Sequence, residues 1–297
     1  MARPAPAATR AVDVISFLTA HPARGFTLSE LVRALGMNVA SAHATLAVLD
    51  DTGFVVRDPI HRTYILGPAL AAVGFATMEQ HPAIDAALEQ ADALSTELNR
   101  TILVAARAGR DAIFVARRGP AGSGEVPGYP GDKVPLKAPV GAVFVAWATD
   151  GAIEQWLERA AAGPAAAIHY RGVLGEIRSR GYAVPLRAMT DGGMGEGPIR
   201  LPHSSHPNGT SYPSEVPHGP DEWLEVLGGL ASDHLVSVRT IAAPIFDAVG
   251  QVQLALSITG GEEPMTALEV HRLGQRLMRT TDAVTKRTRG IAPSRIP

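Results

Sequence analysis

Residues 26–53, FTLSELVRALGMNVASAHATLAVLDDTG, constrain the fold of this chain more than any other stretch. Thr27 and Glu30 have the spacing of a capping box, in which the two side chains close the start of a helix. Apolar residues recur at helical spacing up to Gly36, a residue type that commonly ends helices in the left-handed conformation. Asn38 is a typical cap for a second helix, which runs to the end of the stretch. The pattern predicts two short helices joined by a tight turn, the helix-turn-helix arrangement.

Two short strands follow this helix pair. Residues 54–57 and 63–66 are rich in β-branched and aromatic side chains, and a turn at Asp58 separates them. For the helix pair alone, an ordinary helical hairpin is the alternative. The added strands favour a winged helix-turn-helix, because three elements then agree in order and length. Arg57 and Arg62 lie on or beside the wing, where a phosphate or minor-groove contact would be made, although a solvated hairpin carries such residues too.

Composition limits the remaining possibilities. With 297 residues, 46% hydrophobic and 19% charged, the chain is long enough for two globular domains. Its net charge of -2 gives no overall attraction to nucleic acid, so any such signal must be local. The absence of cysteine excludes disulfides, cysteine-based zinc sites and cysteine nucleophiles. No signal peptide or bilayer-spanning apolar run is apparent, so we expect a cytoplasmic protein with no membrane partner.

The sequence divides into parts with different patterns. We expect a disordered tail at 1–9, a winged helix-turn-helix domain at 10–67, a linker helix at 68–82, a second domain at 83–290, and a tail at 291–297. The first helix of the N-terminal domain is expected at about 10–20. In the second domain we expect strands at 102–106, 112–117, 182–184, 236–246 and 251–258, and helices at 83–99, 140–148, 153–162, 173–180, 223–230 and 265–288. Residues 190–222 are rich in Gly, Pro, Ser and His and are expected to form a flexible insertion or lid. The second domain is therefore of the α+β class.

This order of parts resembles the IclR family of bacterial transcriptional regulators. The matching pieces keep their order and spacing over nearly the whole chain, at residues 28–31, 36–37, 46, 49, 53–54, 134–136, 177–184, 241–247 and 255–260. The resemblance implies two domains: an N-terminal winged helix-turn-helix and, after a linker helix, a C-terminal α+β GAF-like effector domain. It also implies a ligand-responsive regulator that binds double-stranded operator DNA and a small-molecule effector as a homodimer or a dimer of dimers.

The residues expected to contact DNA depart from the family pattern. The family's recognition helix usually opens with a Pro-Lys-Ser-Thr-like segment and carries an arginine soon after, whereas this chain has residues 38–41, NVAS, and then Ala44. Residues 38–49 contain no lysine or arginine. The candidate DNA contacts are the polar residues of this helix and the wing arginines: Asn38, Ser41, His43, Thr45, Arg57 and Arg62. The alternative is a sensor or interaction protein that keeps the winged helix for dimerisation.

The resemblance also suggests an effector site. The family's pocket positions match here at Val140, Gly141, Thr240, Ser257 and Thr259. Backbone N–H groups at the helix start near Gly141 could hold a carboxylate, and Lys137 or Arg187 could add positive charge. We therefore expect a small organic acid, carboxylic or aromatic, as effector. For each hydroxyl the alternative is an ordinary strand residue.

Motifs of known chemistry are missing from the sequence. It has no Walker loop, no HExxH motif and no G-x-S-x-G elbow, so we expect no enzymatic activity and name no catalytic residue. His203, His206 and His218 gather in the insertion, and their spacing could suit a metal. Without cysteine or a nearby acidic frame, we expect neither a metal site nor a cofactor.

Overall fold

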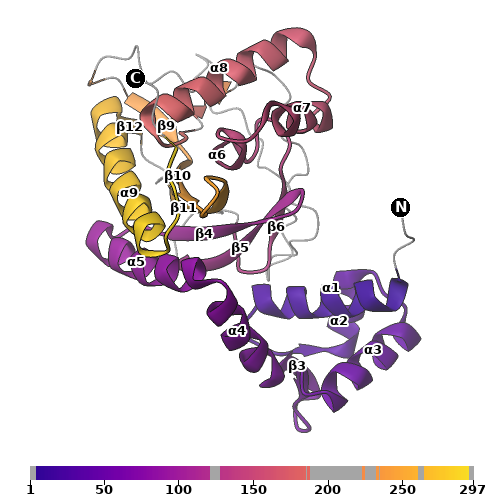
Figure 1. Cartoon of the computed structure of the whole chain (residues 1–297). Coiled ribbons are helices and arrows are strands. Elements are labelled where there is room, and N and C mark those ends of the chain that lie inside the picture. Colours follow the sequence, from indigo (N-terminus) through magenta and orange to yellow (C-terminus); the bar gives the residue numbers. More distant parts are fainter. Residues whose placement is uncertain are drawn as a thin grey trace. The chain divides into compact units, whose positions relative to one another are not determined.

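The chain divides into two compact units. The computed structural model describes residues 5–120, 128–184, 186–187, 223–224, 232–233, 235–259 and 264–293. The N-terminal unit comprises the described residues up to His81 together with Pro130–Asp132, and the C-terminal unit comprises the other described residues. In Figure 1 the N-terminal unit carries helices α1 to α4, and the C-terminal unit begins with α5.

The N-terminal unit is a small helical domain with a three-stranded sheet. Its helices are α1 (Pro6–Ala20), α2 (Leu28–Leu35), α3 (Val39–Asp51) and α4 (Ala69–Gln80). Its strands are β1 (Phe26–Thr27), β2 (Val55–Arg57) and β3 (Thr63–Leu66), in the order β1-β3-β2. Leu18, Leu31 and Leu46 lie in one buried cluster, so α1, α2 and α3 share a core. The predicted winged helix-turn-helix is confirmed.

The predicted caps of this unit are present. Thr27 Oγ1 accepts the backbone N–H of Glu30 at 3.3 Å, and the Glu30 carboxylate accepts the backbone N–H of Thr27 at 2.7 Å. This hydrogen bond from the Thr27 backbone, followed by one from Arg24, lowers the pKa of Glu30. Gly36 ends α2 with φ of 60°, in the left-handed region. The local sequence signals thus fix both ends of α2.

Helix α1 begins earlier than expected. It starts at Pro6, whereas the sequence pattern placed a disordered tail at 1–9 and the helix start near Arg10. Proline at the first helical position has its φ already near the helical value and loses no hydrogen bond there. The predicted tail is therefore wrong from Pro6 onward.

The C-terminal unit is built on two antiparallel sheets. The five-stranded sheet has the order β10-β11-β4-β5-β6, formed by β10 (Thr240–Phe246), β11 (Val252–Thr259), β4 (Ile102–Ala108), β5 (Asp111–Arg118) and β6 (Lys133–Pro135). The four-stranded sheet has the order β12-β9-β7-β8, formed by β12 (Met265–Thr266), β9 (Leu235–Val238), β7 (Leu186–Arg187) and β8 (Trp223–Leu224). With its helices this unit is α+β, as expected.

Helices cover both faces of the five-stranded sheet. They are α5 (Pro82–Leu98), α6 (Ala142–Val145), α7 (Asp150–Arg159), α8 (Pro164–Arg180) and α9 (Ala267–Arg287). Residues of α5 and α9 share a core with Ile241, Leu256 and Ile102, which lie on one face of the sheet. Residues of α6, α7 and α8 share a second core with Ala242 and Ala255, on the opposite face. Figure 1 shows α5 and α9 running beside the sheet, away from α7 and α8.

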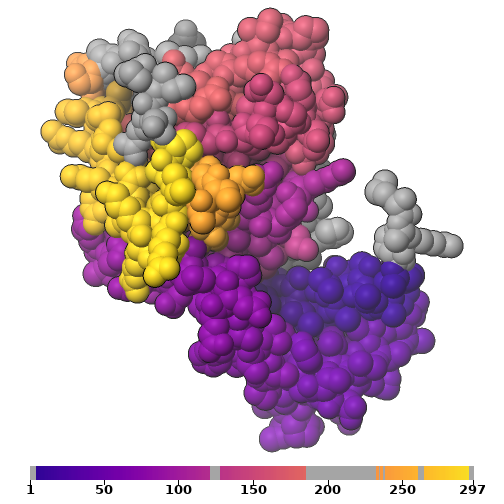
Figure 2. Space-filling model, viewed as in Figure 1, coloured from indigo at the N-terminus to yellow at the C-terminus, as the bar shows by residue number. Residues whose placement is uncertain are grey.

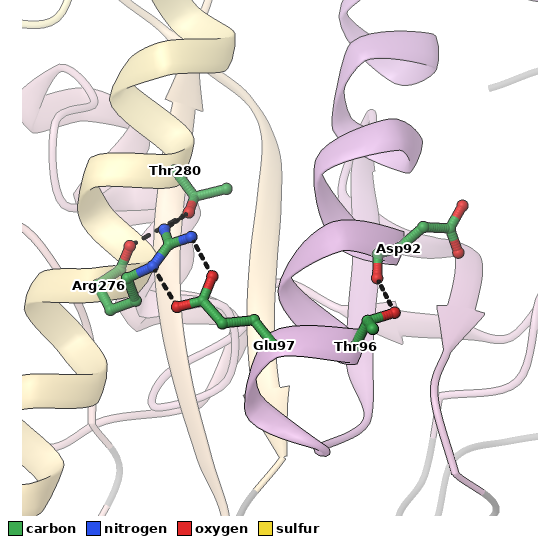
Figure 3. Close-up of polar contacts among 5 residues, drawn as sticks. All are labelled: Asp92, Thr96, Glu97, Arg276 and Thr280. Carbon is green, nitrogen blue, oxygen red and sulfur yellow. Dashed lines mark hydrogen bonds and ion pairs between the residues drawn. The ribbon is translucent and has the colours of Figure 1, made fainter.

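An ion pair joins the two helices of the first face. The Arg276 guanidinium of α9 donates through Nε to Glu97 Oε1 at 2.8 Å and through a second nitrogen to Oε2. Its third nitrogen donates to the hydroxyl of Thr280 (Figure 3). Hydrogen bonding to Arg276 lowers the pKa of Glu97, and the same bond raises the pKa of the guanidinium. This two-point geometry holds α5 against α9.

Several predicted boundaries in this unit are wrong. The helix expected at 140–148 shortens to α6, because Gly141 adopts a left-handed φ of 77° just before it. Helix α8 begins at Pro164 rather than near residue 173, again with proline in the first turn. The strand expected at 182–184 is a single bridge between Ala183 and Ala242.

The later part of the chain differs as well. The strand expected at 236–246 is broken at Arg239, so that β9 and β10 belong to different sheets. Trp223–Leu224 is a strand rather than the start of a helix. Ile291, placed in the predicted tail, donates its backbone N–H to the carbonyl of Asp247 at 2.9 Å. The predicted insertion at 190–222 lies outside the described residues.

A helix that crosses a membrane needs about 20 mostly apolar residues. No single described helix meets that requirement, and only α2 and α3 taken together do so, across a bend of 115°.

Candidate nucleic-acid interface and effector site

Helix α3 is the second helix of the helix-turn-helix and presents an exposed surface. Its start is fixed by Asn38, whose Oδ1 accepts the backbone N–H of Ser41 at 2.7 Å. Ala42, Leu46 and Leu49 face the core of the unit. Because the helix turns 100° per residue, the opposite side carries residues 40, 44 and 47, which are alanines and are exposed.

The predicted polar contacts of α3 differ in their accessibility. Asn38 and His43 are exposed, whereas Ser41 and Thr45 are half-buried at the side of the helix. The side-chain oxygen of Asn38 is engaged in the cap, so its amide nitrogen is the group left to donate toward DNA. His43 therefore has the best position of the four for a base contact.

The wing is attached to α3 by a direct hydrogen bond. Asp50, in the last turn of α3, accepts the backbone N–H of Arg57 at 3.1 Å. The Arg57 guanidinium lies 5.9 Å from the centre of the Tyr64 ring, on the neighbouring strand β3. Arg62 closes the wing turn with a positive φ of 54°. Both arginines are exposed, and the wing protrudes from the surface of its unit (Figure 2).

The wing turn has its own internal bonds. Asp58 Oδ1 accepts the backbone N–H groups of Ile60 and His61, and Oδ2 bonds the His61 ring at 2.8 Å. The side-chain bond from His61, followed by the backbone bonds, lowers the pKa of Asp58. Ile60 at the tip is 82% exposed. The turn is thus ordered by its own aspartate and presents an apolar side chain beside two arginines.

The candidate effector hydroxyls share one face of the five-stranded sheet. Thr240 lies opposite Thr259 in the β10–β11 pair, and Ser257 lies opposite Ala242. Alternation along the strands puts these residues on the same face as Ala255, the face that α6 covers. The Thr259 hydroxyl is buried and donates to the carbonyl of Thr101 at 3.2 Å. Ser257 and Thr240 are only half-buried and are the better candidates to meet a ligand.

The loop before α6 holds the other candidate effector residues of this unit. Gly141 has no room for a side chain, since a Cβ there would lie 2.3 Å from Leu136 Cδ2. The carbonyl of Val140 accepts the indole N–H of buried Trp156 at 2.8 Å. Lys137 is half-buried on the same loop. Because α6 is a single turn, its dipole is small, which weakens the expected carboxylate site at its start.

Two further residues were not found by sequence reasoning. Leu103 on β4 lies opposite Ser257, and a Cβ on Gly128 would lie 2.8 Å from its Cδ1 and 3.3 Å from the Phe114 ring. Leu103 therefore lies next to Ser257 on the neighbouring strand, and Phe114 lies one strand further along the sheet. The sequence gives no local signal for them, because their nearness to Ser257 depends on strand register.

The remaining predicted site residues are only partly described. Arg187 lies on β7, paired through its backbone with Ser237 and Trp223, and its side chain is outside the description. His203, His206 and His218 also lie outside the described residues. Within the described part of the chain, no group of three or more His, Asp or Glu residues is placed to hold a metal ion.

Comparisons with known proteins agree with this geometry. Residues 7–59 match the family model of the IclR helix-turn-helix domain. Similar solved structures include an IclR-type transcriptional regulator from Alicyclobacillus acidocaldarius (20% identity, 96% of this chain, 99% of the other, TM-score 0.61). Another is HmgR from Pseudomonas aeruginosa (25% identity, 96% and 99%, TM-score 0.58). A third is an IclR homolog from Microbacterium hydrocarbonoxydans in complex with 4-hydroxybenzoate (16% identity, 93% and 98%, TM-score 0.56). No curated protein matches the sequence.

The fold and the matched domain together define the class of protein. A capped helix-turn-helix with a β-wing, followed by an α+β unit, is a DNA-binding regulator architecture. Within that class, residues 7–59 match the IclR helix-turn-helix domain, and the chain has the fold of IclR-type transcriptional regulators along nearly its whole length.

Proposed function

We propose that this protein is a ligand-responsive regulator that binds operator DNA as a dimer. When a small organic acid binds the C-terminal unit, the dimer leaves the DNA or changes its arrangement on it. The observation that carries the proposal is the wing held to α3 through Asp50 and Arg57, in a chain with the fold of IclR regulators. Phosphate contacts from exposed Arg57 and Arg62 would fix the register of α3 in the major groove.

DNA binding is tested with the chain's own upstream region. We expect the full-length protein to shift a duplex from that region in a gel, with an affinity that falls as salt rises from about 50 to 200 mM, because phosphate contacts release counterions. A duplex of unrelated sequence serves as control and should bind more weakly. Absence of salt-sensitive binding to any duplex would rule out the proposed function.

Helix α4 supports the proposal of a dimer. None of its twelve residues is buried within the described part of the chain. Two of its large apolar side chains are well exposed, Phe75 at 74% and Val73 at 48%. A large apolar side chain exposed on a helix that buries none of its residues commonly marks a protein contact. A second copy of the chain would cover Phe75. Phe75→Glu should then increase the monomer fraction in analytical ultracentrifugation, whereas Gln80→Glu, a charge change at the end of the same helix, should not.

The effector proposal rests on the face shared by Ser257 and Thr240. These hydroxyls, with the apolar Leu103 on the strand next to Ser257, suit a ligand with one polar end and one flat apolar part. The M. hydrocarbonoxydans homolog was solved with such a molecule, 4-hydroxybenzoate. We therefore infer a small carboxylic or aromatic acid as effector, with Lys137 available on the adjoining loop for its charge.

A thermal-shift screen tests the effector site. Ligands that bind only the folded state stabilise it, by about 2.7 kcal/mol at a hundredfold excess over Kd. We expect benzoates with a para-hydroxyl, and 4-hydroxybenzoate as the first probe, to raise the unfolding temperature. Ser257→Ala should reduce the shift, and Ser179→Ala, on α8, should leave it unchanged. Equal shifts in both variants would argue against this face.

A second function is favoured by one observation, the absence of cations from α3. An interaction protein that keeps the winged helix for dimerisation would explain the exposed alanines at 40, 44 and 47. The two functions differ in what a ligand does. In the regulator, the effector changes DNA affinity, and DNA changes effector affinity by the same factor, because the coupling is reciprocal. Titrating 4-hydroxybenzoate with and without bound duplex measures that factor.

A further inference from the structure

The exposed side of α3 carries apolar residues from its start to Val48. Ala40, Ala44 and Ala47 point away from the core, and Val39 and Val48 beside them are 61% and 63% exposed. No lysine or arginine occurs between Asn38 and Asp51. A helix in this position normally faces DNA, and residues 7–59 match the IclR helix-turn-helix domain. The surface that would face base pairs therefore offers methyl groups in place of the usual cations.

The charges of α3 lie at one end only. Asp50 and Asp51 are exposed in its last turn and would be repelled by phosphates, whereas the backbone N–H groups of its first turn attract them. The first half of the helix would therefore lie deeper in the groove than the second. This brings Val39, Ala40 and Ala44, with His43 beside them, nearest to the bases.

One apolar group is available in the major groove. Thymine carries a C5-methyl there, and alanine is among the side chains that contact it. Alanine also lets the helix backbone approach the bases closely, because the side chain is a single methyl. We propose that α3 recognises thymine methyl groups, with Ala40 and Ala44 as the residues that determine specificity. The inference rests on the proposed function, DNA binding, and adds which chemical group is read.

The test removes single methyl groups from DNA. Duplexes are first selected from a randomised pool by the full-length protein at low salt, so no operator needs to be known. In the preferred duplex each thymine is then replaced, one at a time, by deoxyuridine, which keeps the base pair and lacks only the methyl. Affinities are measured by fluorescence anisotropy at one salt concentration. Removal of a methyl group that is buried in the complex should weaken binding roughly fourfold.

Protein variants assign the contact to a residue. Ala44→Gly should remove the thymine-over-deoxyuridine preference at one position, and Ala40→Gly should remove it at another. Ala165→Gly, at an exposed position in α8, is the control and should keep both preferences. Thermal unfolding checks that each variant is folded, since glycine lowers helix stability relative to alanine.

The possible results distinguish a failure of the thymine-methyl contact from a failure of DNA binding. Salt-sensitive binding with no deoxyuridine effect at any position would overturn the methyl contact and leave DNA binding intact. The same holds if Ala40→Gly and Ala44→Gly retain the full preference. Binding to no duplex at all, with self-association that Ala44→Glu abolishes, would contradict DNA binding itself and identify the apolar face as a protein contact.

Discussion

Asp50 of α3 accepts the backbone N–H of Arg57 in the wing at 3.1 Å, so the helix and the wing are joined by a side chain whose charge opposes DNA. The bond holds strand β2 beside the end of α3 and thereby sets where the Arg57 side chain leaves the backbone. The carboxylate that makes this bond is exposed and would lie near phosphates. Asp50 thus has a structural benefit and an electrostatic cost for the same function.

Two substitutions separate these effects. Asp50→Asn keeps an oxygen acceptor and removes the charge, so DNA affinity should rise severalfold at low salt. Asp50→Ala removes both, and we expect its stability to fall by about 0.5–1 kcal/mol relative to Asp50→Asn. Urea unfolding and anisotropy titrations measure the two quantities. If both variants bind DNA alike and are equally stable, the bond has no role in placing the wing.

The cap of α3 gives a second prediction. Asn38→Ala should destabilise the N-terminal unit by about 1 kcal/mol, because the N–H of Ser41 loses its acceptor. Asn38→Asp should keep stability, since aspartate caps equally well and suits the helix dipole. The same aspartate should weaken DNA binding, because it adds a negative charge at the end of α3 nearest the phosphates. Chemical denaturation gives the stabilities. A loss of stability in both variants would show that the missing cap is not what destabilises Asn38→Ala.

Gly141 gives a third prediction, in the C-terminal unit. Its φ of 77° and its contact with Leu136 both oppose a side chain. Gly141→Ala should destabilise the protein by about 2 kcal/mol and lower effector affinity by displacing the loop around Val140. Gly172 in the middle of α8 has open space around its Cα, and Gly172→Ala should stabilise by up to about 1 kcal/mol. Differential scanning calorimetry compares the two. A neutral Gly141→Ala would mean that the loop adjusts freely.

The Glu97–Arg276 pair predicts how the stability of the protein depends on pH. The pKa of Glu97 is lowered in the folded state by its hydrogen bond to Arg276. Its stabilisation is therefore present above the unfolded-state value of 4.5 and is lost as pH falls through the lower folded-state pKa. Relative to wild type, Glu97→Gln should cost about 0.5–1 kcal/mol at neutral pH and nothing in strong acid.

A matched control exists on the same helix pair. Glu89 bonds Arg287 through one nitrogen, and both side chains are more exposed than those of Glu97 and Arg276. Glu89→Gln should therefore have a smaller effect at every pH. Urea unfolding from acid to neutral pH compares the two variants. A difference between wild type and Glu97→Gln that stays constant over this range would exclude the carboxylate charge as its cause.

Local signals in the sequence predicted the N-terminal unit well. The caps at Thr27 and Asn38 and the turn at Gly36 are determined by residues within a few positions of each other, and each is confirmed. Strand β1 escapes prediction because two residues have no periodicity. The start of α1 differs from the expectation because Pro6 reads as part of a tail, although proline is favourable in a first turn.

Several features of the C-terminal unit could not be predicted, because they depend on contacts that sequence patterns do not reveal. The single turn of α6 follows from Gly141 fitting against Leu136, and the break at Arg239 follows from β9 and β10 joining different sheets. Thr259 looked like a ligand contact, but its hydroxyl donates to Thr101, a residue far away in sequence. Leu103 could be placed opposite Ser257, and Phe114 one strand further along the sheet, only once the strand register was known.

The central claim is that this chain binds DNA through its winged helix-turn-helix, with cations supplied by the wing. The most direct measurement is the salt dependence of duplex binding for wild type and for the double variant Arg57→Ala/Arg62→Ala, with Arg171→Ala on α8 as control. We predict that the slope of log K against log salt becomes shallower by about 1 for each phosphate that the variant no longer neutralises, with unchanged binding in the control. An unchanged affinity and slope in the double variant would contradict the claim.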